Sequence, residues 1–207
     1  MKSGLVVEDT LDDKYFLSCM LIKAFPGMKI EKFSNVSEAW EITSDHHFSI
    51  ALIDICLPDG NGIDLIKHIR EQSPDTFVVV ATICDDNEHL FSALKAGIHG
   101  YLLKDMQDEV FIKKLQGILQ GEPPLSPGIA RKLLRYFSEK VEHTKTRSIK
   151  LSPREVEVLT FIAKGFSKKE IAKFLDLSGN TIARYIKDIT SVPTLKFQTK
   201  ISHCIFD

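Results

Sequence analysis

The sequence of 207 residues has no apolar run long enough to cross a membrane, which takes about 20 consecutive apolar residues in a helix. Its first 25 residues carry acidic side chains rather than the basic and apolar leader of a secreted protein. Its four cysteines, Cys19, Cys56, Cys84 and Cys204, lack the spacing of metal sites. We therefore expect a cytoplasmic protein with free thiols, and we interpret Cys56 and Cys84 as incidental residues rather than redox sensors.

The net charge is also small, at −1, but the two signs are unevenly distributed. Residues 1–144 hold 15 Lys and Arg against 22 Asp and Glu, whereas residues 145–207 hold 12 against 6. The composition, 43% hydrophobic and 27% charged, is that of an ordinary globular protein. Opposite charge in the two parts predicts two domains, of which the second faces a polyanion; a solvated basic surface is the simpler alternative.

A short apolar run, Ile50–Ile53, ends on the carboxylate of Asp54 and is followed by turn-forming residues such as Pro58 and Gly60. This pattern is typical of a strand buried on both faces of a parallel sheet. Asp54 is then expected at the carboxyl end of a central strand, where open α/β sheets bind ligands. A lone aspartate in such a place is more often a turn former or a helix cap, so the prediction depends on which other residues share this edge.

Further apolar segments alternate with helical patterns along the first 120 residues. Strands are predicted at 4–8, 28–33, 50–53, 77–82 and 100–103, and helices at 10–24, 35–44, 63–71, 88–96 and 108–119. Right-handed crossovers make the expected product an α/β fold with a five-stranded, doubly wound parallel sheet of the flavodoxin-like type. In the first helix, the spacing predicts that one broad face holds Leu11, Phe16, Met20 and Ala24.

Four of the predicted strands end on polar side chains, namely Glu8 with Asp9, Asp54, Thr82 and Lys104. The carboxyl ends of parallel strands lie at one edge of the sheet, so these groups are expected to meet. Three neighbouring carboxylates repel one another, and a hard cation such as Mg²⁺ relieves that repulsion. A carboxylate can form an aspartyl-phosphate, the metal and Lys104 can neutralise charge, and Thr82 can hydrogen-bond a phosphoryl oxygen.

The segments VVED, LIDICLPDGNG, VVVAT and YLLKD, in this order and spacing, resemble the receiver domain of two-component response regulators over residues 2–120. The resemblance implies that a sensor histidine kinase phosphorylates Asp54 and that Lys104 contacts the phosphoryl group. It implies that Thr82 and Tyr101 form the switch pair. It implies no enzyme activity beyond self-catalysed phosphotransfer and dephosphorylation. The ligands that it implies for Mg²⁺ are Glu8, Asp9, Asp54 and the backbone carbonyl of Cys56.

The predicted domains are a receiver domain at 1–121, a linker with a helix at 122–147 and a helical domain at 148–207. The boundary after the receiver domain follows from the Pro- and Gly-rich stretch GEPPLSPG. In the helical domain, Ser152 and Ser167 each begin a capping box, and Ser178 caps a third helix that extends to about residue 189.

The predicted third helix is amphipathic. At 100° per residue, its isoleucines gather on one side, opposite Asn180, Arg184 and Lys187. A basic and amide outer face suits the major groove of DNA, because Lys and Arg neutralise phosphates while Arg and Asn read base edges. The alternative is a solvated helix face without a partner.

Residues 151–189 resemble the LuxR-type helix-turn-helix, so the whole chain resembles a response regulator of the NarL/FixJ class. The resemblance implies a homodimer that binds double-stranded DNA and has no membrane partner. Ala183 stands where the family often has Lys, and a tail with Pro193 replaces the family's fourth helix. The DNA contacts that the resemblance implies are Asn180, Thr181, Arg184, Tyr185 and Lys187.

Two other functions stay open. The altered tail, from Thr190 onward, favours a phosphoacceptor or interaction module whose DNA binding is impaired. A phosphohydrolase on a similar sheet also uses an aspartyl nucleophile, but the C-terminal domain and the lack of a substrate-specificity insert argue against it.

Overall fold

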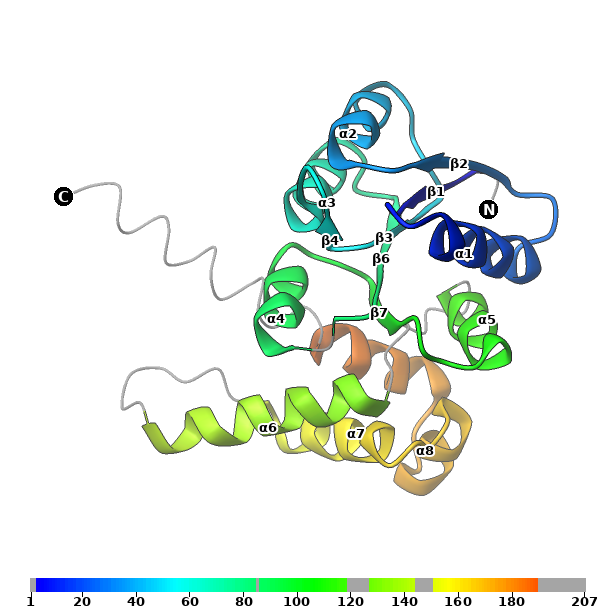
Figure 1. Ribbon diagram of the computed structural model, residues 1–207. Coiled ribbons are helices and arrows are strands. Elements are labelled where there is room, and N and C mark those ends of the chain that lie inside the picture. The colour runs from blue at the N-terminus through cyan, green and yellow to red at the C-terminus, as the bar shows by residue number, and fades with distance from the viewer. Residues whose placement is uncertain (1–2, 85, 119–126, 144–150, 190–207) are drawn as a thin grey trace.

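The computed structural model describes residues 3–84, 86–118, 127–143 and 151–189, and Figure 1 shows a layered α/β unit above a group of helices. Five parallel strands form the main sheet in the order β2-β1-β3-β6-β7. Their bounds are β1 Ser3–Val7, β2 Lys29–Phe33, β3 Ile50–Ile53, β6 Phe77–Thr82 and β7 Gly100–Leu103. The predicted five-stranded parallel sheet is therefore confirmed, with β3 at its centre.

Five helices cover the two faces of this sheet. Their bounds are α1 Leu11–Ala24, α2 Val36–Asp45, α3 Gly62–Gln72, α4 Asn87–Lys95 and α5 Asp108–Gly117. Helices α1 and α5 lie on one face, whereas α2, α3 and α4 lie on the other (Figure 1). The sheet is therefore doubly wound, as the alternation of strands and helices predicted.

Successive residues of each strand face opposite sides of the sheet. In β1, Val6 packs in the apolar cluster beneath α1 and α5, while Leu5 and Val7 pack in the cluster beneath α2, α3 and α4. All three side chains are fully buried. Burial on both faces explains why the strands are continuous apolar runs rather than alternating ones.

The predicted apolar face of α1 is wrong in one residue. Met20 and Ala24 are buried as predicted, but Leu11 is 79% exposed. Nine positions at 100° each place Leu11 on the side of the helix opposite Met20. The fully buried Leu17 and Leu21 complete the face instead.

The loop after β3 contains a short antiparallel pair that the sequence did not predict, formed by β4 (Cys56–Leu57) and β5 (Gly60–Asn61). Between these strands, the carboxylate of Asp59 accepts hydrogen bonds from the backbone amides of Val36 and Ser37, at 2.7 and 2.9 Å. These bonds lower the pKa of Asp59. They also fix the loop that follows the central strand to the start of α2.

The second unit contains α6 (Pro127–His143), α7 (Pro153–Ala163), α8 (Lys168–Leu175) and a helix over residues 179–189, which we call the outer helix. Both predicted capping boxes are present, and the third predicted cap also forms. The residues that make them are Ser152 with Glu155, Ser167 with Glu170, and Ser178. The guanidinium of Arg131 in α6 donates to the carbonyl of Ala163, at 2.8 Å.

The two units share one buried apolar cluster. It includes Leu94 and Ile98, next to α4 and β7, together with Ile186 and Ile189 of the outer helix. Figure 1 shows this helix directly below β7. None of the helices in the described ranges combines the length and hydrophobicity that spanning a bilayer requires. The predicted tail from Thr190 lies outside the described residues.

Candidate functional site

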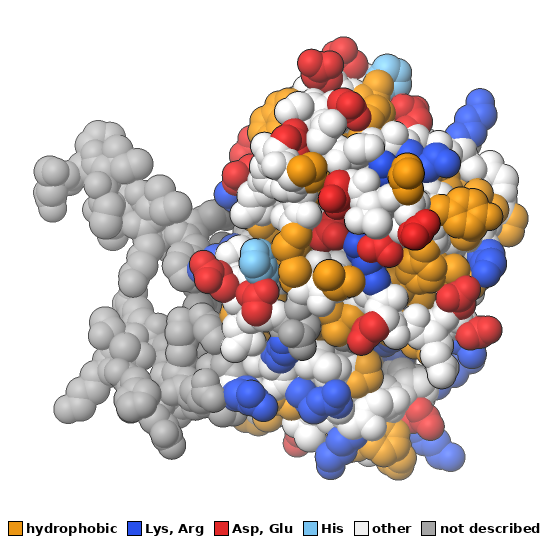
Figure 2. Space-filling view, in the orientation of Figure 1, with side chains coloured by type: hydrophobic (Ala, Val, Ile, Leu, Met, Phe, Trp, Pro, Cys, Tyr) orange, Lys and Arg blue, Asp and Glu red, His pale blue; other side chains and the backbone are white. Residues whose placement is uncertain are grey.

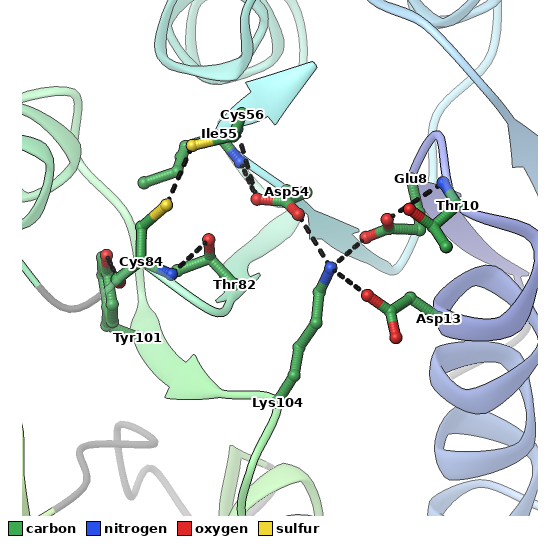
Figure 3. Close-up of polar contacts among 10 residues, drawn as sticks. All are labelled: Glu8, Thr10, Asp13, Asp54, Ile55, Cys56, Thr82, Cys84, Tyr101 and Lys104. Carbon is green, nitrogen blue, oxygen red and sulfur yellow. Dashed lines mark hydrogen bonds and ion pairs between the residues drawn. The ribbon is translucent and has the colours of Figure 1, made fainter. Parts of the chain in front are cut away.

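The ammonium group of Lys104 is the centre of a charged cluster at the carboxyl edge of the sheet (Figure 3). Its Nζ atom lies 2.5 Å from Glu8 Oε2, 2.7 Å from Asp54 Oδ2 and 2.9 Å from Asp13 Oδ2. The contacts span up to 96 positions of sequence. Lys104 follows β7, Glu8 follows β1 and Asp54 follows β3, so parallel strands bring the three together as predicted.

Both oxygens of the Asp54 carboxylate have partners. Oδ2 accepts from Lys104, and Oδ1 accepts from the backbone amides of Ile55 and Cys56, at 2.6 and 3.2 Å. Asp54 is only 4% exposed. An ionised carboxylate is stable in such a buried place because charge-assisted hydrogen bonds replace its hydration.

Gly62 allows the loop to close over Asp54. A Cβ atom added at Gly62 would lie 2.3 Å from the backbone carbonyl oxygen of Asp54 and 2.9 Å from the Cα of Ile55. The amide of Gly62 donates to the carbonyl of Ile55 at 3.2 Å. Backbone packs directly against backbone here, so only glycine fits without a shift of the loop.

The cluster changes the pKa of two of its members. Burial raises the pKa of Glu8, and the nearby Asp54 charge adds to this, while Lys104 acts in the opposite direction. Burial alone would lower the pKa of Lys104, but its hydrogen bonds to Asp13, Asp54 and Glu8 raise it above its ordinary value. Because three carboxylates contact this one ammonium, the cluster holds more negative charge than Lys104 neutralises.

The third carboxylate at Lys104 comes from Asp13, which is not among the predicted site residues. Asp9, which was selected, is exposed, and among the described residues it makes no ion pair with Lys104. Asp13 lies in the first turn of α1, and its side chain is 37% exposed. The available signal was that α1 begins at the edge where β1 ends, so an acid in its first turn reaches the same place.

The two predicted switch residues meet at Cys84 (Figure 3). The Thr82 hydroxyl accepts from the Cys84 amide at 3.1 Å, and the Tyr101 hydroxyl donates to the Cys84 carbonyl at 2.8 Å. Thr82 and Tyr101 are both fully buried, and burial raises the pKa of Tyr101. In this arrangement the Thr82 hydroxyl is engaged with the following loop rather than with Asp54.

The residue types at this edge fit Mg²⁺, because they are hard oxygen donors and carry excess negative charge. Burial is the main cause of the raised pKa of Glu8, and the neighbouring charge of Asp54 adds to it. In the described part of the chain, no group of three or more His, Cys, Asp or Glu side chains is arranged to hold a metal ion. The carboxylates instead converge on Lys104.

Partial burial and the adjacent Cys84 thiol raise the pKa of Cys56 to about 12.

The outer helix presents the amphipathic pattern that the sequence predicted. Three of its isoleucines are buried. On the other side Asn180, Arg184 and Lys187 are exposed, and Thr181 and Tyr185 are half-buried. The guanidinium of Arg184 lies 5.8 Å from the centre of the Tyr185 ring. In Figure 2, acidic side chains are most frequent over the α/β unit and basic ones near the lower edge of the molecule.

Part of the outer helix faces the α/β unit. Burial lowers the pKa of His99, next to β7, to about 4, and the positive charges of Arg70 and Lys187 contribute to this shift. Lys187 is therefore close enough to β7 for its charge to act on His99. Ala183, which stands where the family often has Lys, is 8% exposed and so belongs to the buried side of the outer helix.

Comparison with protein families gives two matches along the chain. Residues 5–116 match the family described as "Response regulator receiver domain", and residues 150–191 match "Bacterial regulatory proteins, luxR family". The receiver match alone covers more than half of the sequence. The chain belongs to the two-component response regulators. With its LuxR-type domain, it is a transcription regulator of the NarL/FixJ class.

Several characterised response regulators are similar over most of their length. The oxygen regulatory protein NreC of Staphylococcus epidermidis is 31% identical over 170 residues, covering 79% of this chain and 78% of NreC. The nitrate/nitrite response regulator protein NarL of Escherichia coli is 31% identical over 163 residues, covering 79% and 76%. Nothing in these comparisons favours the alternative of a module with impaired DNA binding.

A solved structure supports the fold of the response regulator as a whole. RcsB from Salmonella enterica serovar Typhimurium, bound to the promoter rprA in the presence of phosphomimetic BeF₃⁻, is similar with a TM-score of 0.56 and 23% identity. The similarity covers 97% of this chain and all of that one. The likeness therefore extends through both units rather than the α/β unit alone.

Proposed function

We propose that Asp54 accepts a phosphoryl group from a sensor histidine kinase and thereby controls the binding of the outer helix to double-stranded DNA. The observation that carries this proposal is the bonding of Asp54, which shares the ammonium of Lys104 with Glu8 at the carboxyl edge of the sheet. A phosphoryl group on Asp54 adds charge that Lys104 is placed to neutralise.

The residues that would hold Mg²⁺ are Glu8, Asp9, Asp54 and the backbone carbonyl of Cys56. When bound, the metal would neutralise charge on the carboxylates and the phosphoryl group. Asp13 has a different role in this proposal: it retains Lys104 at the cluster when the other carboxylates turn toward the cation. Its contact with Lys104 Nζ at 2.9 Å is the basis for this assignment.

The two switch residues would transmit the change. A phosphoryl oxygen on Asp54 would accept a hydrogen bond from the Thr82 hydroxyl, and as this side chain turns toward Asp54 its oxygen would leave the Cys84 amide that donates to it at present. Release of Thr82 from Cys84 alters the loop whose carbonyl binds Tyr101. Tyr101 lies on β7, next to the segment that contacts the outer helix, so the change can loosen the packing between the two units.

Once the packing between the two units is loosened, the polar face of the outer helix would contact DNA. The residues that would make these contacts are Asn180, Thr181, Arg184, Tyr185 and Lys187. The exposed cations supply phosphate contacts, and Arg184 and Asn180 supply hydrogen bonds to base edges. We propose a homodimer in the cytoplasm, with a receiver domain at 1–121, a linker with a helix at 122–147 and a LuxR-type domain at 148–207. No activity beyond self-catalysed phosphotransfer and dephosphorylation belongs to this function.

Replacement of Asp54 tests the proposal directly. The full chain is incubated with Mg²⁺ and acetyl phosphate, and the intact protein is weighed by mass spectrometry. We expect one added phosphoryl group in the wild type and none in Asp54→Asn. Asp64→Asn is the matched control, because Asp64 is an exposed carboxylate on α3, paired with Lys67, and should leave phosphorylation unchanged. Equal phosphorylation of Asp54→Asn and the wild type would overturn the proposal.

A further inference from the structure

Two cysteine thiols meet beside the carboxylate of Asp54. The Sγ atoms of Cys56 and Cys84 lie 3.0 Å apart, and Figure 3 shows them bridging two loops of the edge that holds the charged cluster. Cys56 lies two residues after Asp54, and Cys84 two residues after Thr82. Cys56 is exposed and Cys84 is half-buried, and both are free thiols in the structure.

We propose that Cys56 and Cys84 form a reversible redox site that closes to an intramolecular disulfide. A disulfide has an S–S distance of about 2.05 Å, so the two sulfurs need to approach by about 1 Å. Both residues lie outside the main parallel sheet, which allows a movement of this size. The exposure of Cys56 gives a small oxidant access to the pair. Disulfides in a reducing compartment are typically transient and act as redox sensors.

The chemistry requires a peroxide as oxidant. The sulfur of Cys84 attacks the peroxide as its thiolate, because the raised pKa of Cys56 keeps that thiol protonated. The O–O bond breaks, Cys84 becomes a sulfenic acid, and one water leaves. The Cys56 thiol then attacks the sulfenic sulfur of Cys84, the S–S bond forms while the S–O bond breaks, and the hydroxyl leaves with the thiol proton as a second water. The two thiols together lose two electrons, and one peroxide gains them. A dithiol reductant restores both thiols by exchange.

The disulfide would affect the phosphorylation switch because Cys84 binds both switch residues. Its amide donates to Thr82 and its carbonyl accepts from Tyr101. On the other side of the bond, the amide of Cys56 donates to Asp54 Oδ1. A covalent link holds these two loops in their present positions, so Thr82 stays bound to Cys84. Oxidation is therefore expected to slow phosphoryl acceptance, a consequence that rests on the proposed function.

The first experiment tests the disulfide without reference to phosphorylation. The parent protein is the full chain with Cys19→Ser and Cys204→Ser, so only the pair remains. After treatment with hydrogen peroxide, peptide mass spectrometry is expected to find a Cys56–Cys84 disulfide that dithiothreitol removes. Cys56→Ser and Cys84→Ser, each in the parent, should instead give a sulfenic acid that dimedone labels. If peroxide leaves both parent thiols free or carries them to sulfinic acid without a disulfide, the proposal is overturned.

The second experiment tests the coupling. The rate of phosphoryl uptake from acetyl phosphate is measured for the oxidised and the reduced parent. The ratio of these two rates is compared with the same ratio for Cys84→Ser. We expect a severalfold slower uptake in the oxidised parent and a ratio near one in Cys84→Ser. Disulfide formation without a change in uptake would overturn the coupling. Failure of the reduced parent to take up phosphate would count against the proposed function, while the disulfide result would stand.

Discussion

The charged cluster at Lys104 and the polar face of the outer helix are built in opposite ways. Lys104 and Glu8 are 96 residues apart in sequence, and both side chains are almost fully buried. Arg184 and Lys187 are one helical turn apart and exposed. The cluster is therefore a product of the whole sheet, whereas the face of the outer helix is a product of one short segment.

This difference decides how each region tolerates substitution. A buried ion has exchanged its hydration for specific partners, so removal of one partner leaves the others unpaired. A solvated ion on a helix has lost little hydration, so its removal changes stability only slightly. Substitutions in the charged cluster should therefore lower the free energy of unfolding, whereas substitutions on the outer helix should change the affinity for DNA and its salt dependence.

The largest expected effect is that of Lys104→Met on stability. Its ammonium contacts three carboxylates, two of which are buried, and removal of one member of a buried ion pair typically costs roughly 3–5 kcal/mol. We expect the lower part of this range, because water reaches the Asp13 side chain. Urea unfolding measures the loss.

Lys23→Met is the matched control for that substitution. Lys23 pairs with Asp108 at 3.3 Å, but the two side chains are 54% and 47% exposed. Its removal should cost less than about 1 kcal/mol. Similar losses in Lys23→Met and Lys104→Met would remove the distinction between buried and solvated charge.

The pH dependence of stability should carry a signature of His99, at the boundary between the two units. Its pKa is about 4 in the folded protein against 6.5 for the free side chain, so between these values the unfolded chain binds more protons. Stability therefore rises with pH across this window. The contribution of His99 to the free energy of unfolding is fully present above pH 6.5 and is lost as the pH falls toward 4. The full contribution is up to about 3 kcal/mol.

Unfolding curves at several pH values test this expectation. His99→Asn should lose the rise between pH 4 and 6.5, whereas His46→Asn, at an exposed position, should keep it. An unchanged rise in His99→Asn would mean that His99 is solvated in the folded protein rather than buried.

The fold could be predicted from the sequence because local patterns and global topology agree. Apolar runs such as Ile50–Ile53 end at turn residues, and helix caps such as Ser152 and Ser167 lie where the structure has them. The hairpin of β4 and β5 was not predictable, because two-residue strands have no periodic pattern. The exposure of Leu11 shows that helical spacing must be tested by angle and not only by the presence of apolar residues.

The candidate site was predictable to the level of the strand ends. The shared edge of a parallel sheet brings Glu8, Asp54 and Lys104 together whatever the intervening sequence. The contact of Asp13 depends on the orientation of α1 and on side-chain rotamers, which residue order does not specify. The approach of Cys56 and Cys84 depends on two loop conformations, and the sequence therefore favoured incidental cysteines.

On the outer helix, Arg184→Ala should weaken DNA binding without loss of stability. A side chain that reads a base edge contributes about 1–3 kcal/mol to binding at its preferred sequence. Lys187→Ala should weaken binding to all sequences and reduce the slope of log affinity against log salt by about 0.9. Fluorescence anisotropy with phosphorylated protein and a duplex selected from a random library measures both. Lys67→Ala, on the receiver domain, should change neither; a loss of folding stability in Arg184→Ala would contradict the solvated description.

The smallest expected effect links the two regions. Lys187→Gln removes a positive charge that lowers the pKa of His99, so this pKa should rise by roughly a few tenths of a unit at low salt. Arg70→Gln should raise it further, because Arg70 contributes more than Lys187. NMR titration of the His99 ring measures both shifts, and Lys173→Gln on α8 is the control. If only Arg70→Gln changes this pKa, the outer helix does not lie against β7 in solution, and the two regions act as separate bodies.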